Sequence, residues 1–169
     1  MINDYSRRGW VDARGLRLPV IVVRPGAPNA ALTGAWSTVV REPLNGVDCT
    51  LPIPMDVKLP VASYQTVVGA IRVLLNDIDA EQLGPDRTLM LPSLSTSPAE
   101  LYEAASKLAA EHQLPLGTPR ARAEEVATRI VSGMGSHSDG RRAESLGLPR
   151  DDGPDAVVRA YAQDYVLRA

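Results

Sequence analysis

An almost unbroken apolar run at residues 18–23, LPVIVV, is the feature that most restricts how this chain can fold. Its side chains are mostly branched and do not alternate between apolar and polar. That pattern is typical of a strand buried on both faces of a parallel sheet. Residues 24–26, RPG, end the run. The sequence therefore predicts an α/β fold in which helices cover this strand.

The end of this predicted strand allows two interpretations. Ligands of open α/β folds bind at the carboxyl edge of the sheet, and Gly26 would let a flat ring or a phosphate approach the main chain closely. Turn residues such as Pro25 and Gly26 also end strands that bind nothing. This stretch alone leaves both interpretations open.

Composition restricts the class of protein. A chain of 169 residues with 44% hydrophobic residues can form one ordinary domain with a real core. Its net charge of −2 argues against a strongly basic nucleic-acid surface and against a polybasic membrane segment. No apolar run approaches the roughly 20 residues that span a bilayer, and the first residues lack a signal-peptide pattern. We expect a cytoplasmic protein without nucleic-acid or membrane partners.

Few residues could supply metal-binding or nucleophilic chemistry. Cys49 is the only cysteine and is interpreted as a small buried hydrophobe. His112 and His137 have no partner at metal-ligand spacing, so we expect no metal site. The adjacent carboxylates at 124–125 and 151–152 point in different directions and are interpreted as solvated charges.

One glycine-containing segment invites comparison with dinucleotide-binding loops. Residues 133–138, GMGSHS, open like such a loop, but the third glycine is missing and no clear strand–loop–helix unit surrounds them. We interpret the segment as a surface loop. No complete G-x-G-x-x-G occurs anywhere in the chain.

Apolar residues at helical spacing predict the main helices. A first helix follows Asn29, which can cap it, and ends at a turn formed by Asn45 and Gly46. A second helix, at residues 63–75, is expected to bury one face, formed by Val67, Val68, Ile71, Leu74 and Leu75. Further helices are predicted at 97–112, 124–131, 140–146 and from residue 154 onwards.

Short strands are predicted at residues 48–53, 58–62 and 87–91. Prolines in the first two favour edge or broken strands. Residues 114–122 are rich in Pro and Arg and predict a loop.

The first residues read as the end of an element. Residues 4–8 have the pattern of a last helical turn, and Gly9 is placed to cap it in a left-handed conformation. Helices usually begin with a capping residue and run longer than this. We therefore expect the polypeptide to continue a structure whose earlier part precedes Met1.

Seven segments carry a resemblance to one family, in the order in which they occur. They are INDYSRRG at 2–9, LRLP at 16–19, VRPG at 23–26 with Pro28 and Asn29, REPLNG at 41–46, LPSLS at 91–95, LGL at 146–148 and the helix at 156–165. Together they resemble the C-terminal half of the extended short-chain dehydrogenase/reductases, the NAD-dependent epimerase/dehydratases. Within that family the chain is most similar to a D-erythronate (sugar-acid) dehydrogenase-like branch.

The resemblance implies the C-terminal part of an extended Rossmann-like fold, with the last sheet strand followed by a small α+β substrate-binding domain. Residues 1–28 would end the dinucleotide-binding domain, and residues 29–169 would form the substrate-binding domain. Pro25 and Gly26 would lie beside the nicotinamide ring of NAD or NADP.

The resemblance also implies two substrate-binding residues. Asn29 would face a sugar or sugar-acid substrate. Lys58 stands where many relatives carry an Arg that binds a phosphate or carboxylate. A Lys there supplies the charge but not the bidentate fork.

The family's catalytic groups do not occur in this sequence. The family uses a glycine-rich loop and a Tyr-x-x-x-Lys pair, yet none of the five tyrosines here has Lys four residues later. We identify no catalytic residue and predict the substrate-domain half of a sugar or sugar-acid dehydrogenase that is inactive alone. The alternatives are a non-enzymatic small-ligand or protein-binding module, and a truncated remnant stable only as a homo-oligomer.

Overall fold

The computed structural model describes residues 1–27 and 31–168, so Asn29 and its predicted capping role lie outside the described residues. The helices are α1 (Ile2–Arg7), the 3-10 helix η1 (Leu32–Gly34), α2 (Ala35–Leu44), α3 (Tyr64–Asn76), α4 (Ala80–Leu83), α5 (Pro98–His112), α6 (Glu125–Ser132), α7 (Arg141–Ser145) and α8 (Pro154–Tyr165). The strands are β1 (Gly15–Arg17), β2 (Val20–Val22), β3 (Cys49–Leu51), β4 (Leu59–Ser63), β5 (Thr88–Met90), β6 (Leu94–Thr96) and β7 (Pro119–Ala121). The predicted α/β class is confirmed.

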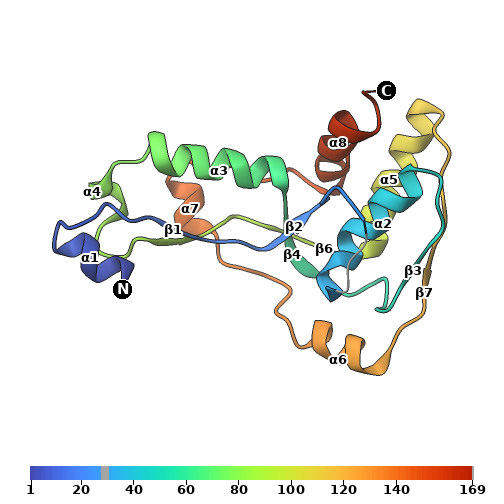
Figure 1. Ribbon diagram of the computed structural model, residues 1–169, viewed down its shortest axis with the longest axis horizontal. Helices are drawn as coiled ribbons and strands as arrows, with labels where there is room; N and C mark the ends of the chain where they lie inside the picture. Colours follow the sequence, from blue (N-terminus) through green and yellow to red (C-terminus); the bar gives the residue numbers. More distant parts are fainter. Residues whose placement is uncertain (28–30, 169) are drawn as a thin grey trace.

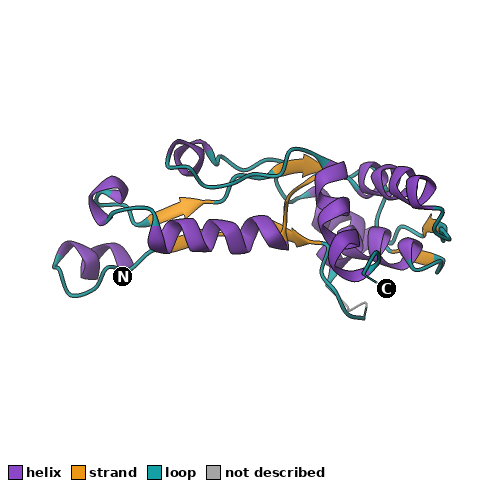
Figure 2. Cartoon of the chain, turned by 90° about the horizontal axis from the view of Figure 1, so that it is seen from above, coloured by secondary structure: helices purple, strands orange, loops and turns teal. Residues whose placement is uncertain are grey.

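The molecule is elongated (Figure 1). One end contains α1, α4, β1 and α7, and the other contains α2, α5, α8, β3 and β7. Helix α3 runs lengthwise beside the strands of the middle section, as two perpendicular views show (Figure 1, Figure 2).

The strands of the described residues form three small sheets. The three-stranded sheet has the order β2-β4-β6, in which β4 is parallel to β2 and antiparallel to β6. The other two sheets are the parallel pairs β1 with β5 and β3 with β7. The predicted parallel pairing of the apolar run is therefore confirmed.

The apolar run itself is less buried than the sequence suggested. Leu18 is 43% exposed, and β2 begins only at Val20, after a break that separates it from β1. Pro19 occupies the break, where its missing N–H cannot join a ladder. Only Val22 and Val23 are fully buried, so burial on both faces applies to the end of the run that leads into the 24–26 segment.

The edge-strand prediction for residues 58–62 is wrong, because β4 is the central strand of its sheet. Pro60 lies opposite Ser95 of β6, and the parallel ladder with β2 starts one residue later, at Val61. The proline therefore stands outside the part of the strand that pairs on both sides. The segment predicted as a loop, 114–122, contains β7, which gains its ladder from β3.

The larger hydrophobic core joins α2, α5 and α8 to the three-stranded sheet. Trp36, Val39 and Val40 of α2 are fully buried. The indole Nε1 of Trp36 donates a hydrogen bond of 3.0 Å to the carbonyl oxygen of Thr96, which satisfies the one polar group of this side chain.

The second core lies under α3 and combines this helix with residues near β5 and α7. Val67 and Leu74 of α3 are buried, but Val68, Ile71 and Leu75 are 64%, 43% and 60% exposed. The five apolar residues therefore do not form one buried face. Their side chains are spread over a wide part of the helix circumference. Only the side of α3 that carries Val67, Ala70 and Leu74 is buried.

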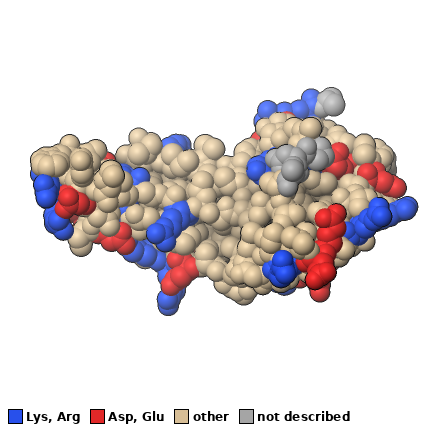
Figure 3. All heavy atoms as spheres, turned by 60° about the horizontal axis from the view of Figure 1, so that its bottom comes forward, with Lys and Arg blue, Asp and Glu red and all other residues tan. Residues whose placement is uncertain are grey.

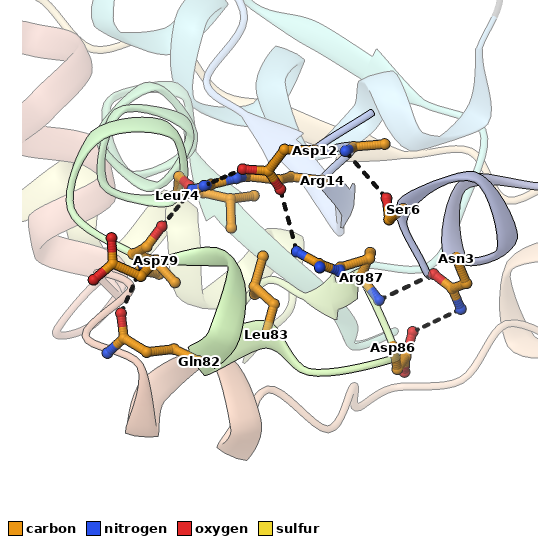
Figure 4. A network of polar contacts seen from close by, with 12 residues as sticks. Asn3, Ser6, Asp12, Arg14, Leu74, Asp79, Gln82, Leu83, Asp86 and Arg87 are labelled. Carbon is orange, nitrogen blue, oxygen red and sulfur yellow. Dashed lines mark hydrogen bonds and ion pairs between the residues drawn. The ribbon is translucent and has the colours of Figure 1, made fainter. Parts of the chain in front are cut away.

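A polar network fastens the N-terminal segment to the rest of the molecule (Figure 4). Asn3 Oδ1 accepts a hydrogen bond from the backbone N–H of Arg87, and Asp12 forms an ion pair of 3.2 Å with the guanidinium of the same arginine. Arg14 donates to the carbonyl oxygen of Ile78, just after α3. The predicted helix end at residues 4–8 is confirmed by α1, which Gly9 follows with a φ of +71°.

The interpretation of Asp151 as a solvated charge is wrong. Asp151 is 8% exposed and accepts hydrogen bonds of 2.7–2.8 Å from the Ser63 backbone N–H, the Ser63 hydroxyl and the Thr66 hydroxyl. The neighbouring Asp152 is exposed, as expected. The buried carboxylate joins the segment before α8 to the N-terminus of α3.

Candidate functional site

The carboxyl end of β2 borders two cavities that share one residue, Arg24. The chain turns away from the sheet at Pro25 and Gly26, and Gly26 adopts a φ of +94°, a conformation that favours glycine. A Cβ at Gly26 would meet no described atom within 4 Å. Among residues 1–27 and 31–168, no side chain or backbone atom therefore covers the open side of Gly26.

The larger cavity, of about 470 Å³, follows β2 and is mainly apolar. Its walls come from β2, from the start of β4 and from the segment after α6. The lining residues are Leu18, Pro19, Val20, Ile21, Arg24, Thr33, Leu59, Pro60, Met134 and Gly135.

The smaller cavity, of about 100 Å³, is polar and lies between the turn after β2 and helix α2. Arg24, Ser37, Thr38 and Arg41 supply its polar side chains. Ser37 and Arg41 fall on successive turns of α2, which brings both side chains to the same cavity.

The end of β2 is held in place by α2. The backbone N–H of Arg24 donates to Ser37 Oγ at 3.1 Å, and Nη1 of Arg41 donates to the carbonyl oxygen of Arg24 at 2.9 Å. Both side chains of α2 are almost fully buried. Nε of Arg41 forms an ion pair of 2.8 Å with Glu42, which offsets part of the cost of burying the guanidinium.

The structure places the sequence-predicted site residues differently. Pro25 lines the polar cavity and Gly26 follows it in the same turn, whereas Asn29 lies outside the described residues. Nζ of Lys58 forms an ion pair of 2.6 Å with Glu100 Oε1. Lys58 precedes Leu59, which lines the larger cavity. The roles predicted for these four residues stay predictions.

The pairing of Lys58 changes the charge that it offers to a ligand. Burial would raise the pKa of Glu100, but hydrogen bonds from Lys58 and from the backbone N–H of Ser97 outweigh it and lower this pKa. Glu100 is therefore ionised at neutral pH and partly neutralises the lysine.

Sequence reasoning missed Arg24, Ser37 and Arg41 as candidate binding residues. A signal was present for Arg41, because a charged residue directly follows the apolar pair at 39–40 in a helix that the sequence predicts to be half-buried. The surface loop predicted at 133–138 is largely exposed, yet Met134 and Gly135 also form one wall of the larger cavity.

Two groups that could act as a nucleophile or a base, Cys49 and Tyr64, have raised pKa values. Burial, with the charges of Glu42 and Asp48, raises the pKa of the Cys49 thiol to about 11. Burial and a hydrogen bond with Asp164 raise the pKa of Tyr64 to about 12. A tyrosine that acts as a general base needs a shift in the opposite direction.

Three further observations concern the described part of the chain. Among residues 1–27 and 31–168, no group of three or more His, Cys, Asp or Glu residues could hold a metal ion. No helix within the same ranges is long and apolar enough to cross a bilayer. Acidic and basic side chains are interspersed on the face shown in Figure 3, without one large basic patch.

No family model matches this chain, but individual proteins do. It is 39% identical over 166 residues to a D-erythronate dehydrogenase from Cupriavidus necator, a match that covers 97% of this chain and 50% of that protein. It is 33% identical to a D-erythronate dehydrogenase from Haemophilus influenzae, over 96% of this chain and 51% of that protein. The chain thus spans about half the length of the curated relatives that it matches.

Solved structures of longer proteins are also similar to this chain over about half of their length. A nucleoside-diphosphate-sugar epimerase from Agrobacterium tumefaciens superposes with a TM-score of 0.87 at 36% identity, over 97% of this chain and 47% of that one. A GalE-like L-threonine dehydrogenase from Cupriavidus necator superposes with a TM-score of 0.76 at 19% identity and therefore supports the fold alone. Each comparison matches nearly all of this chain to about half of a longer protein.

Proposed function

Because this chain is related to the D-erythronate dehydrogenases and has the fold of part of an extended short-chain dehydrogenase/reductase, we propose that it forms the substrate-binding half of an NAD(P)-dependent sugar or sugar-acid dehydrogenase. The observation that carries this proposal is the identity of 39% across 97% of the chain. The cavities at the carboxyl end of β2 support it, because this edge is where α/β folds bind ligands.

NAD or NADP would supply the hydride acceptor. The open main chain at Gly26 fits a flat ring at one side of the site. The sequence offers no glycine-rich loop for the pyrophosphate, so the residues present do not fit the whole cofactor. We propose that Pro25 and Gly26 form one wall of a cofactor site whose other groups this chain does not supply.

The residues of this chain would bind and orient the substrate rather than move a proton. Asn29 and Lys58 remain proposed substrate-binding residues. The raised pKa values of Tyr64 and Cys49 leave neither group suited to deprotonate a hydroxyl at neutral pH. We therefore expect no hydride transfer by this chain alone.

Two measurements on the chain test this proposal. We expect D-erythronate to bind saturably in a calorimetric titration, and no NADH or NADPH to form when the chain is incubated with D-erythronate and either oxidised cofactor. Cofactor reduction by the chain alone would contradict the proposal that this chain binds the substrate but lacks the catalytic groups. Failure of D-erythronate and related sugar acids to bind would contradict the substrate-binding role.

Exposed apolar surface favours one alternative, a remnant that is stable as a homo-oligomer. Val68, Ile71 and Leu75 line the outer side of α3, and β2 has one unpaired edge in the described sheet. Sedimentation of concentrated samples distinguishes the two: a monomer that binds a sugar acid supports the substrate-binding half, and an oligomer without ligand binding supports the remnant.

The domain division and the location belong to the same proposal. The boundary between residues 28 and 29 stays a prediction. Each of the two hydrophobic cores contains or contacts residues from 1–28 as well as from 29–169. The absence of nucleic-acid and membrane partners and the cytoplasmic location also stay predictions.

A further inference from the structure

We propose that the polar cavity between β2 and α2 is a carboxylate-binding subsite, in which Arg24, Ser37, Thr38 and Arg41 recognise the acid group of a small hydroxy acid. The inference rests on the proposed function and deepens it, because it names the part of the substrate that this half of the site selects. It adds a second anion-binding position, beside helix α2, to the one proposed at Lys58.

The first support is a buried donor without an acceptor. Ser37 is 1% exposed and lines the cavity. Its Oγ accepts the hydrogen bond from the Arg24 backbone N–H, which leaves the hydroxyl proton without an acceptor among residues 1–27 and 31–168. Buried polar groups are usually satisfied, so an unused donor on a cavity wall indicates an acceptor supplied by a ligand.

The second support is the donor capacity of Arg41. Its guanidinium has five N–H groups. Within the described chain these make three hydrogen bonds: to Glu42, to the Arg24 carbonyl oxygen and, at 3.5 Å, to Thr38 Oγ1. Donors therefore remain on a residue that is 7% exposed and lines the cavity. A planar guanidinium fork matches the two oxygens of a carboxylate.

The third support is charge. Glu42 pairs with Arg41, but the side chain of Arg24 forms no hydrogen bond or ion pair within the described ranges. Two arginines and one carboxylate leave a net positive charge beside the cavity. Lys58, by contrast, is already paired with Glu100.

The two cavities together suit a short hydroxy acid. A volume of about 100 Å³ is enough for a carboxylate group. Arg24 also borders the cavity of about 470 Å³, so the hydroxyl-bearing carbons can continue past Arg24 along β2.

Calorimetric titration of the full chain tests the subsite with four probes: D-erythronate, glycolate, the neutral polyol erythritol and inorganic phosphate. We expect both carboxylates to bind, erythritol to bind at least tenfold more weakly than D-erythronate, and phosphate to bind more weakly than glycolate. Phosphate binding that equals or exceeds that of glycolate would overturn the assignment to a carboxylate.

Two variants locate the site. Arg24→Gln should weaken D-erythronate and glycolate roughly 10- to 100-fold, the effect expected when a charged hydrogen bond is lost. Arg41→Lys keeps the positive charge but removes the planar guanidinium group. It should therefore also weaken the binding of D-erythronate and glycolate. Arg72→Gln is the matched control, because Arg72 is an exposed arginine on α3 that lines neither cavity.

The outcomes separate this inference from the proposed function. Should Arg41→Lys fail to fold, Arg24→Gln decides, because the Arg24 side chain forms no hydrogen bond or ion pair within residues 1–27 and 31–168. Unchanged binding in Arg24→Gln overturns the subsite while the substrate-binding role stands. If glycolate binds in an Arg24-dependent way and no sugar acid binds, the subsite stands and the proposed substrate is wrong.

Discussion

Arg41 shows how burial decides the role of a single residue. The sequence places it after Val39 and Val40 on a predicted helix, and the family resemblance directs attention to Lys58 as the anion-binding residue. In the folded chain Lys58 forms an ion pair with Glu100. Arg41 is buried beside the end of β2, and some of its guanidinium N–H groups have no acceptor within residues 1–27 and 31–168. Only the fold brings residue 41 to residue 24, which explains why spacing alone could not find this pair.

Asp151 is the residue whose removal should affect stability most clearly. Asp151→Ala leaves the Ser63 N–H, the Ser63 hydroxyl and the Thr66 hydroxyl without their acceptor. Unsatisfied buried donors cost about 1–3 kcal/mol each, with partial relief from water, so we expect a loss of about 2–4 kcal/mol in the free energy of unfolding.

Urea denaturation measures this loss, and Asp152→Ala is the matched control. Asp152 is exposed, so its substitution should change the free energy of unfolding by less than about 0.5 kcal/mol. Equal effects of the two substitutions would show that Asp151 does not anchor α3.

Cys49 should react slowly with alkylating reagents at neutral pH. Its pKa is raised from 9.0 to about 11, mainly by burial, and only the thiolate reacts. The rate of iodoacetamide labelling of the folded chain should therefore rise about tenfold per pH unit up to about pH 10. A rate that levels off near pH 9, as in a short unstructured Cys peptide, would contradict the raised pKa.

Helix α3 shows what periodicity can and cannot predict. Its bounds, Tyr64–Asn76, match the expected 63–75, and Ser63 caps it by accepting from the Thr66 N–H at 3.1 Å. Which apolar residues face inward was not predictable, because valine, isoleucine and leucine occupy more than half of the helix circumference.

Strands β6 and β7 were not predicted from the sequence. Each is three residues long and is stabilised by pairing with a strand that is distant in sequence, so its own residues give little signal.

Truncating a side chain on the inner face of α3 should lower the free energy of unfolding much more than truncating one on its outer face. Leu74 is 3% exposed and Leu75 is 60% exposed, although they are neighbours of the same type. Leu74→Ala should lower the free energy of unfolding by about 2–5 kcal/mol, and Leu75→Ala by less than about 0.5 kcal/mol. Denaturant titration of both variants measures the difference; similar losses would mean that a partner covers the outer face of α3.

At the scale of the whole molecule, the chain is elongated (Figure 1). It has two hydrophobic cores, and two cavities border the end of β2. The α/β class and the parallel strand were predictable from the apolar run, because an unbroken run of branched apolar residues is typical of a strand in a parallel sheet. The polar cavity was not, since it depends on how α2 packs back onto the turn after β2. Proteins of about twice the length are similar to this chain over about half of their own length.

Joining this chain to the half of the Cupriavidus necator D-erythronate dehydrogenase that it does not match tests whether this chain supplies the substrate-binding half. The measurement is kcat/KM for NAD-dependent oxidation of D-erythronate, with erythritol as the neutral comparison and the donor half alone as the control. We predict turnover only in the joined protein and a kcat/KM at least tenfold higher for D-erythronate than for erythritol. A folded joined protein that binds NAD but oxidises neither compound would contradict the claim that this chain supplies the substrate-binding half.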